Sequence, residues 1–165
     1  MPSSESARAR ALARGPGFWG FLIAHHWPDE LDRCYQIWVG RKPVWFCSRC
    51  TGVYPVLGLM LALFLIHRPA AGLLDLVWLL VLPLPAVLDW AHSRLSGWPG
   101  FNWLRSLTGA LLGVSLARTV QLNMLEPGHW LVVLQLVSMT AIVVLVEGWA
   151  RWRAFRSRAR SGGGP

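Results

Sequence analysis

The sequence predicts an all-α fold, a polytopic bundle of about four membrane helices that follows a cysteine-containing N-terminal cytoplasmic segment. Hydrophobic residues make up 54% of the 165 residues, more than a soluble domain of this size readily buries. Four apolar stretches follow one another, at 52–66, 73–91, 103–122 and 130–149. Charged residues gather outside these stretches, as they do in chains that cross a bilayer.

Each stretch is close to or a little below the ~20 residues that cross about 30 Å of hydrocarbon. Buried core helices of a soluble protein are the alternative interpretation. Four such helices in succession with almost no polar face argue against it, because a helix at a soluble surface shows an amphipathic stripe. The third stretch is the least typical, since Arg105 and Arg118 near its ends have to snorkel or pair.

Two details of the helices follow from single residue types. Pro83 and Pro85 are expected to kink the second helix, because proline lacks the backbone N–H and clashes with the preceding turn. Gly109 and Gly113 have the small-xxx-small spacing that allows the third helix to approach a neighbour closely.

The chain divides into four parts. Residues 1–17 form a basic N-terminus that we expect to be disordered, and 18–51 form a cytoplasmic or interfacial segment rich in cysteine and histidine. Residues 52–150 form the transmembrane domain, and 151–165 a basic flexible tail. Whether 18–24 enter the bilayer is left open.

The distribution of positive charge predicts the orientation. Four crossings place both termini on one side, and all of the 16 Lys and Arg residues except Arg68 and Arg118 then fall on that side. The positive-inside rule makes this side cytoplasmic, in the inner (plasma) membrane. The net charge of +8 has anionic membrane lipids as its expected partner, and no nucleic-acid recognition motif is present.

The strongest local signal for chemistry is the pair of cysteines Cys47 and Cys50. A C-x-x-C turn grips one Zn²⁺ from adjacent positions, and Cys34 with a histidine completes a tetrahedral Cys₃His set. A closed set of four ligands leaves no position for water, so such a metal is structural. The predicted zinc ligands are Cys34, Cys47, Cys50 and His26, with His25 or His92 as alternatives for the fourth.

The same C-x-x-C pair has a redox interpretation. Arg49 between the two cysteines would lower a thiol pKa, as dithiol chemistry requires. The thioredoxin-like βαβ context is missing, however. Unligated, unreactive cysteines are the third alternative.

A second polar group spans the junction between the second and third helices. It contains Asp89, His92, Asn102 and Arg105, and ionisable groups at membrane depth usually face a cavity or a partner. We expect an ion pair between Asp89 and Arg105, with Asn102 capping the third helix. Because this junction is predicted on the side of the cysteines, both groups are expected to share one pocket.

Together these residues resemble the bacterial predicted-membrane-protein family known as domain of unknown function 2085. The resemblance covers about residues 25–118, and it rests on Asp32-Arg33-Cys34, the string Cys47-Ser48-Arg49-Cys50-Thr51-Gly52-Val53-Tyr54, and Asp89, Asn102, Arg105, Thr108, Gly109 and Gly113. It implies several membrane helices but no established activity. The sequence departs from the family pattern after Asp89, where Trp90 stands for a Gly and His92-Ser93 for a Thr-Gln pair.

Three functional hypotheses remain. The first is a zinc-stabilised membrane protein with a structural, scaffolding or small-solute role. The second is an enzyme acting on a lipid or polyprenyl headgroup, in which Arg105 and Asn102 bind an anionic group and Asp89 or His92 acts as acid or base. The third is a thiol redox protein. No P-loop, G-x-S-x-G or D-x-x-D motif is present, so the sequence names no reaction.

Overall fold

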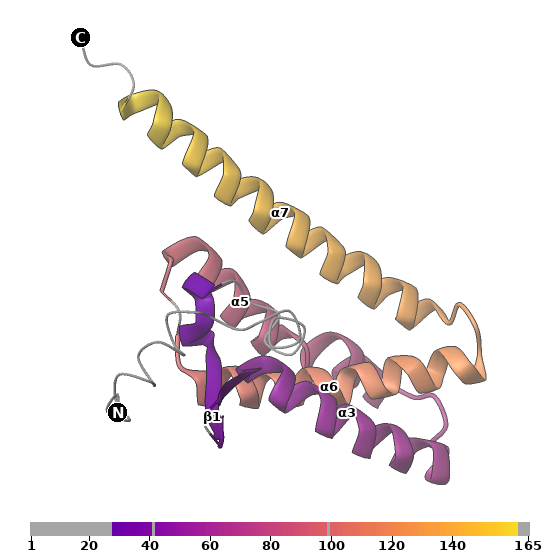
Figure 1. The fold of residues 1–165 in the computed structure, drawn as a ribbon. Coiled ribbons are helices and arrows are strands. Elements are labelled where there is room, and N and C mark those ends of the chain that lie inside the picture. Colours follow the sequence, from indigo (N-terminus) through magenta and orange to yellow (C-terminus); the bar gives the residue numbers. More distant parts are fainter. Residues whose placement is uncertain (1–27, 41, 99, 162–165) are drawn as a thin grey trace.

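The chain folds into long helices with a β-hairpin at one end of them (Figure 1). The computed structural model describes residues 28–40, 42–98 and 100–161. Its elements are η1 (Pro28–Arg33), β1 (Cys34–Val39), β2 (Lys42–Cys47), α3 (Ser48–His67), α4 (Leu74–Leu76), η2 (Val77–Val81), α5 (Leu84–Ser96), α6 (Asn102–Leu125) and α7 (Trp130–Ser161). Each of the four predicted apolar stretches is helical, so the mostly helical prediction is confirmed.

The hairpin was not predicted, and it corrects the expectation of an all-α fold. Strands β1 and β2 pair antiparallel, with Cys34 opposite Cys47 and Val39 opposite Lys42. Gly40 in the turn has a φ of 62°, a left-handed conformation that glycine adopts without strain. Both strands are rich in aromatic and β-branched residues around this turn, which is the usual hairpin signal.

Three helical segments of the described chain are long and apolar enough to cross a membrane. They are Ser48–His67, Leu74–Ser96 and Trp130–Ser157. The third predicted crossing, α6, is not among them, although its 24 residues extend about 36 Å at 1.5 Å per residue. The structure therefore supports a membrane protein with three such helices, and a fourth crossing by α6 stays a prediction.

Helix α6 has its polar side chains on the inside of the protein. Arg105, Thr108, Ser115, Arg118 and Gln121 are all buried. Several apolar side chains of α6 are exposed on its outside, among them those of Leu107, Val120 and Met124. This arrangement is the reverse of a soluble helix and is suited to lipid surroundings, where ionisable groups turn towards the protein.

The closest contact in the fold joins α3 to α6 through three glycines. A Cβ added at Gly109 would lie 2.5 Å from the Arg49 carbonyl oxygen, and one at Gly113 would lie 2.6 Å from that of Val53. A Cβ at Gly52 would overlap the Ser106 carbonyl. The predicted close approach at Gly109 and Gly113 is confirmed, and α3 is the partner helix.

The second long apolar segment, Leu74–Ser96, is interrupted near the two prolines that predicted a kink. It widens to a π-helix over Val77–Val81, closed by a hydrogen bond from the Leu82 N–H to the Val77 carbonyl (3.0 Å), and α5 begins at Leu84. Pro83 and Pro85 lack the N–H groups that would continue the α-helical ladder here. The expected interruption is confirmed.

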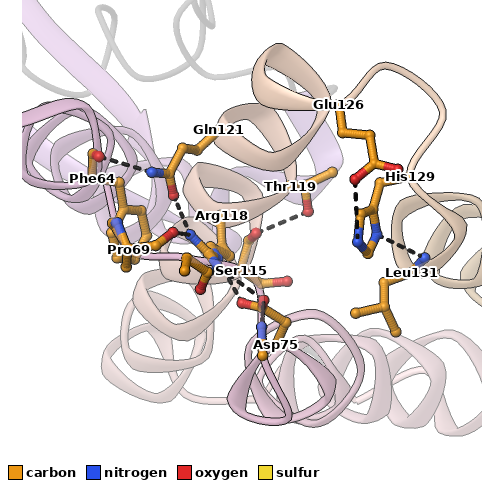
Figure 2. Close-up of polar contacts among 12 residues, drawn as sticks. Phe64, Pro69, Asp75, Ser115, Arg118, Thr119, Gln121, Glu126, His129 and Leu131 are labelled. Atoms are coloured by element: carbon orange, nitrogen blue, oxygen red, sulfur yellow. Dashed lines mark hydrogen bonds and ion pairs between the residues drawn. The ribbon is translucent and has the colours of Figure 1, made fainter. Parts of the chain in front are cut away.

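A buried arginine ties the far end of α6 to its neighbours (Figure 2). Arg118 donates through Nε and Nη2 to the two carboxylate oxygens of Asp75, at 2.6 and 2.9 Å. Its remaining donors reach Gln121 Oε1 (2.5 Å) and the carbonyl oxygens of Pro69 (3.0 Å) and Ala70 (3.1 Å). All five N–H groups of this guanidinium are thus used, so the charge is fully compensated without water.

Polar contacts also fasten α7 to the bundle. Gln135 donates to the Ser115 hydroxyl (2.8 Å), and its side-chain oxygen lies 2.6 Å from Thr119 Oγ1. Near the opposite end of the bundle, Arg94 of α5 makes two hydrogen bonds to Glu147.

Helix α7 continues beyond these contacts to Ser161, so residues 151–161 are helical where a flexible tail was expected. Arg156 packs over the Trp152 ring at 3.9 Å, a contact that supports this last helical stretch.

The Arg118 network predicts an asymmetric response to conservative substitution. Arg118→Lys keeps the charge but cannot make the two-pronged contact with Asp75, and we expect it to lower the free energy of unfolding by about 2 to 4 kcal/mol. Arg94→Lys, at an exposed pair, should leave the unfolding midpoint unchanged. Denaturant titration of both variants in detergent micelles measures the difference, and equal midpoints would contradict a structural role for Arg118.

Candidate functional site

A cavity of about 460 Å³ lies at the hairpin end of the bundle. We call it the arginine pocket. Its lining comes from η1, β2, α3, α5 and α6, and consists of Arg33, Cys47, Ser48, Arg49, Cys50, Val53, Tyr54, Trp90, Ser93 and Arg105. The pocket therefore draws on segments that are far apart in the sequence and that Figure 1 shows converging at one end of the molecule.

Side-chain hydrogen bonds to backbone carbonyls hold the pocket together. The Ser106 hydroxyl donates to the Ser48 carbonyl at 2.7 Å, and the Tyr35 hydroxyl lies 2.9 Å from Ser106 Oγ. The Asn102 amide donates to the carbonyl of Asp32 at 3.0 Å. These bonds fix the hairpin and the first turn of α3 against the first turn of α6, so the position of the pocket wall is set by α6.

Three charged side chains meet beside the pocket, two lining arginines and Asp89. Asp89 accepts a hydrogen bond from Arg49 Nη2, and its carboxylate oxygen lies 4.0 Å from Arg105 Nε. The side chain of Arg105 is 5% exposed and that of Asp89 is 10% exposed. One carboxylate thus faces two guanidinium groups, which leaves an excess positive charge among the three.

Two donors of this group make no hydrogen bond within the described residues, although Arg105 Nε lies at ion-pair distance from Asp89. The Nε atoms of Arg49 and Arg105 are both buried and make no hydrogen bond there. A buried donor that is not hydrogen-bonded costs about 1 to 3 kcal/mol, and more when it is charged. Two pocket-lining arginines whose buried Nε donors lack hydrogen bonds therefore indicate that the pocket favours an anionic acceptor.

The comparison with protein families decides the affiliation of the chain. The family described as Predicted membrane protein (DUF2085) matches residues 32–119, which is more than half of the chain. The chain belongs to this family. No curated protein and no solved structure matches the chain.

The DUF2085 match covers the whole of the arginine pocket. It extends from β1 to α6 and includes both Asp89 and Arg105, whereas α7 lies outside it. The resemblance seen in the sequence is thus confirmed. The family description adds membrane location and no activity.

The structure places the predicted polar group only partly as expected. Asp89 and Arg105 do lie together, but the direct hydrogen bond to Asp89 comes from Arg49. Asn102 is not the cap of α6, which has Phe101 at its N-cap position and no side-chain cap bond; Asn102 fastens the hairpin instead. His92 is exposed and packs edge-on against Trp98, so it does not line the arginine pocket.

Two of the three cysteines, Cys47 and Cys50, line the arginine pocket, and of the predicted polar group only Arg105 lines it with them. Cys47 ends β2 opposite Cys34, and Cys50 follows in the first turn of α3. Within the described residues, which include Cys34, Cys47, Cys50 and His92, no three His, Cys, Asp or Glu side chains are grouped to hold a metal ion. His25 and His26 lie outside the described residues, so the zinc prediction stays a prediction.

The thiol of Cys34 is not suited to nucleophilic chemistry. Burial raises the pKa of this thiol to about 11, and the neighbouring Cys47 adds to the effect. The thiol is therefore protonated at neutral pH, whereas dithiol exchange needs a thiolate. The redox hypothesis concerns Cys47 and Cys50, so this property of Cys34 does not test it.

Sequence reasoning missed several residues of the site. Arg33, Ser48 and Ser106 were not predicted to take part, and Arg49 was considered only as a neighbour of the thiols. The order Asp32-Arg33-Cys34 and the string Cys47-Ser48-Arg49-Cys50 contain two of the pocket arginines beside the cysteines, and this proximity is the signal that could have identified them. Asp75, the partner of Arg118, was also missed, although a lone carboxylate at the start of an apolar stretch signals a buried partner.

Proposed function

We propose that this DUF2085 member is an integral membrane protein that binds the anionic headgroup of a membrane lipid in the arginine pocket. The observation that carries the proposal is the pair of buried Nε donors on Arg49 and Arg105 that make no hydrogen bond within the described residues. Arginine binds phosphate and carboxylate oxygens through its planar fork of donors, and charge-assisted bonds of this kind are about twice as strong as neutral ones. An anion accepting from both arginines would satisfy them.

The lining of the pocket supports a lipid as the source of the anion. The lining also includes Val53 and Tyr54 of α3 and Trp90 of α5. Both helices belong to segments that are long and apolar enough to span a membrane. Tyr54 is 61% exposed, and a tyrosine in this position would lie against lipid at the membrane boundary. A ligand with a charged head and an apolar tail matches a pocket with charged and apolar lining residues.

Binding is favoured over catalysis. Asp89 is engaged by two arginines and His92 is not a lining residue, so neither of the acid/base groups considered for a lipid or polyprenyl enzyme is positioned for that role. The charge distribution supports the cytoplasmic side of the inner membrane for the pocket and for both termini. Arg33, Arg49 and Arg94 belong to the hairpin end, and Arg68 and Arg118 to the opposite end.

The proposal predicts a loss of binding when the buried arginine is neutralised. Arg105→Gln removes charge-assisted hydrogen bonds worth about 1.5 to 3 kcal/mol, so affinity should fall about 10- to 100-fold. The probe is dihexanoyl phosphatidylglycerol, titrated calorimetrically into the full-length protein in neutral detergent. Arg33→Gln, at a half-buried pocket arginine that pairs with Glu30, should show a smaller loss.

Matched controls separate this result from misfolding and from general charge. Arg94→Gln removes a positive charge at the same end but outside the arginine pocket, and it should bind like the unmodified protein. Unchanged affinity in both pocket variants would reject the pocket as the site. Equal affinity for inorganic phosphate would reject a lipid as the source of the anion.

We also propose, as a second role, that the cysteines bind a structural zinc ion with His26. The observation in favour is the register of the hairpin, which sets Cys34 directly opposite Cys47 while Cys50 follows one turn on. Three thiolates and one imidazole form a closed tetrahedral set that would fasten the hairpin to α3. Metal binding would displace the thiol protons.

Metal analysis tests this second role. Protein purified in detergent should contain about one equivalent of zinc per chain, as expected for a single closed site. Cys34→Ala should lose that zinc, whereas Ser157→Ala, a change in the exposed part of α7, should keep it. Absence of zinc from the unmodified protein, or retention of zinc by Cys34→Ala, would reject the predicted ligand set.

A further inference from the structure

The two faces of the hairpin differ in what covers them. Cross-strand partners share a face, so Cys34, Trp45 and Cys47 lie on one side, and all three are less than 9% exposed. The other side, which we call the outer hairpin face, consists of Ile37, Val39, Lys42, Val44 and Phe46 beyond the Tyr35 contact with α6. The inner side is buried at Cys34, Trp45 and Cys47, while Ile37, Val39, Lys42 and Phe46 of the outer side are exposed.

The outer hairpin face is apolar and exposed. Ile37 is 52% exposed, Val39 64% and Phe46 37%. The solvent side of a two-stranded sheet normally carries polar side chains, with apolar ones turned inwards. Here apolar residues occupy both sides, and a contiguous apolar surface of this kind marks a contact with a partner or a membrane.

The connections of the hairpin to α3 and α6 indicate that its outer face contacts the membrane. Strand β2 passes directly into α3, whose 20 residues are long and apolar enough to span a bilayer, and Asn102 fastens the hairpin to the first turn of α6. Figure 1 shows β1 running across the axes of α3 and α6 rather than along them. A hairpin across the end of a membrane-spanning helix lies parallel to the membrane plane.

Aromatic residues mark the same level. Trp98, Phe101 and Trp103, between α5 and the first turn of α6, are each about half exposed. Their rings pack on one another, with centroids 5.3 Å apart for the first pair and 6.4 Å for the second. Exposed tryptophans gather at the headgroup level of membrane proteins, so this end of α6 lies at that level and the hairpin fastened to it does as well.

We propose that the outer hairpin face is embedded in the interfacial layer of a leaflet that contains anionic lipids. Ile37, Val39 and Phe46 contact the upper acyl chains, and Lys42 on the same face reaches the lipid phosphates. The hairpin is thereby a surface anchor, in addition to the spanning helices. This proposal does not depend on ligand binding in the arginine pocket.

Photo-crosslinking in vesicles tests the proposal. A benzophenone amino acid is placed at Val39 of the full-length protein, and at Gln36, an exposed residue on the inner side, as the matched control. Both proteins are reconstituted in vesicles of equal parts phosphatidylglycerol and phosphatidylcholine and irradiated. Intact-mass spectrometry then measures the yield of lipid adduct on each protein. We expect several-fold more lipid adduct from the Val39 position than from the Gln36 position.

Other outcomes would overturn the proposal. Equal adduct yields at the two positions, or no lipid adduct at Val39, would show that the outer hairpin face does not enter the leaflet. Cross-linked dimers from Val39 in place of lipid adducts would identify a second copy of the chain as its partner. Lys42→Glu in the Val39 protein should lower the share of phosphatidylglycerol among the adducts, and an unchanged share would reject the role of Lys42.

Discussion

Backbone contact between α3 and α6 is the constraint on which the rest of the structure depends. Gly52, Gly109 and Gly113 leave no room for a Cβ between the two helices. Because lipid offers no hydrophobic force for association, close packing of this kind is a main source of helix pairing in membranes. The contact fixes the first turn of α3 beside the first turn of α6, and this places Arg49 next to Arg105 and forms the arginine pocket.

Helix α6 carries a buried arginine near each end, and the two have different surroundings. Arg118 uses all five of its donors on Asp75, Gln121 and two loop carbonyls, which is the arrangement of a structural group (Figure 2). Arg105 is equally buried, yet its Nε has no hydrogen-bond partner among the described residues. The first arrangement stabilises the fold by itself, whereas the second leaves a donor free to bind the anion that we propose as the ligand. The contrast distinguishes the structural Arg118 network at one end of the bundle from the proposed binding site at the other.

The sequence predicted those features that rest on local chemistry. Apolar runs gave the helices, Pro83 and Pro85 gave the interruption before α5, and Gly109 and Gly113 gave the close approach. Features that depend on tertiary partners were missed. The pairing of Arg49 with Asp89, forty residues away, depends on how α3 and α5 meet on α6. The hairpin was missed because the cysteine spacing directed attention to metal ligands rather than to the alternating residues around Gly40.

The most direct measurement compares two alanine substitutions on the same helix. Gly52→Ala places a methyl group against the Ser106 carbonyl, whereas Gly58→Ala meets nothing within 4 Å. If α3 and α6 pack backbone to backbone, denaturant titration in micelles will show that Gly52→Ala lowers the free energy of unfolding by at least about 1 to 3 kcal/mol. Gly58→Ala will leave it unchanged or raise it by up to about 1 kcal/mol. Equal stability of the two variants would contradict the account.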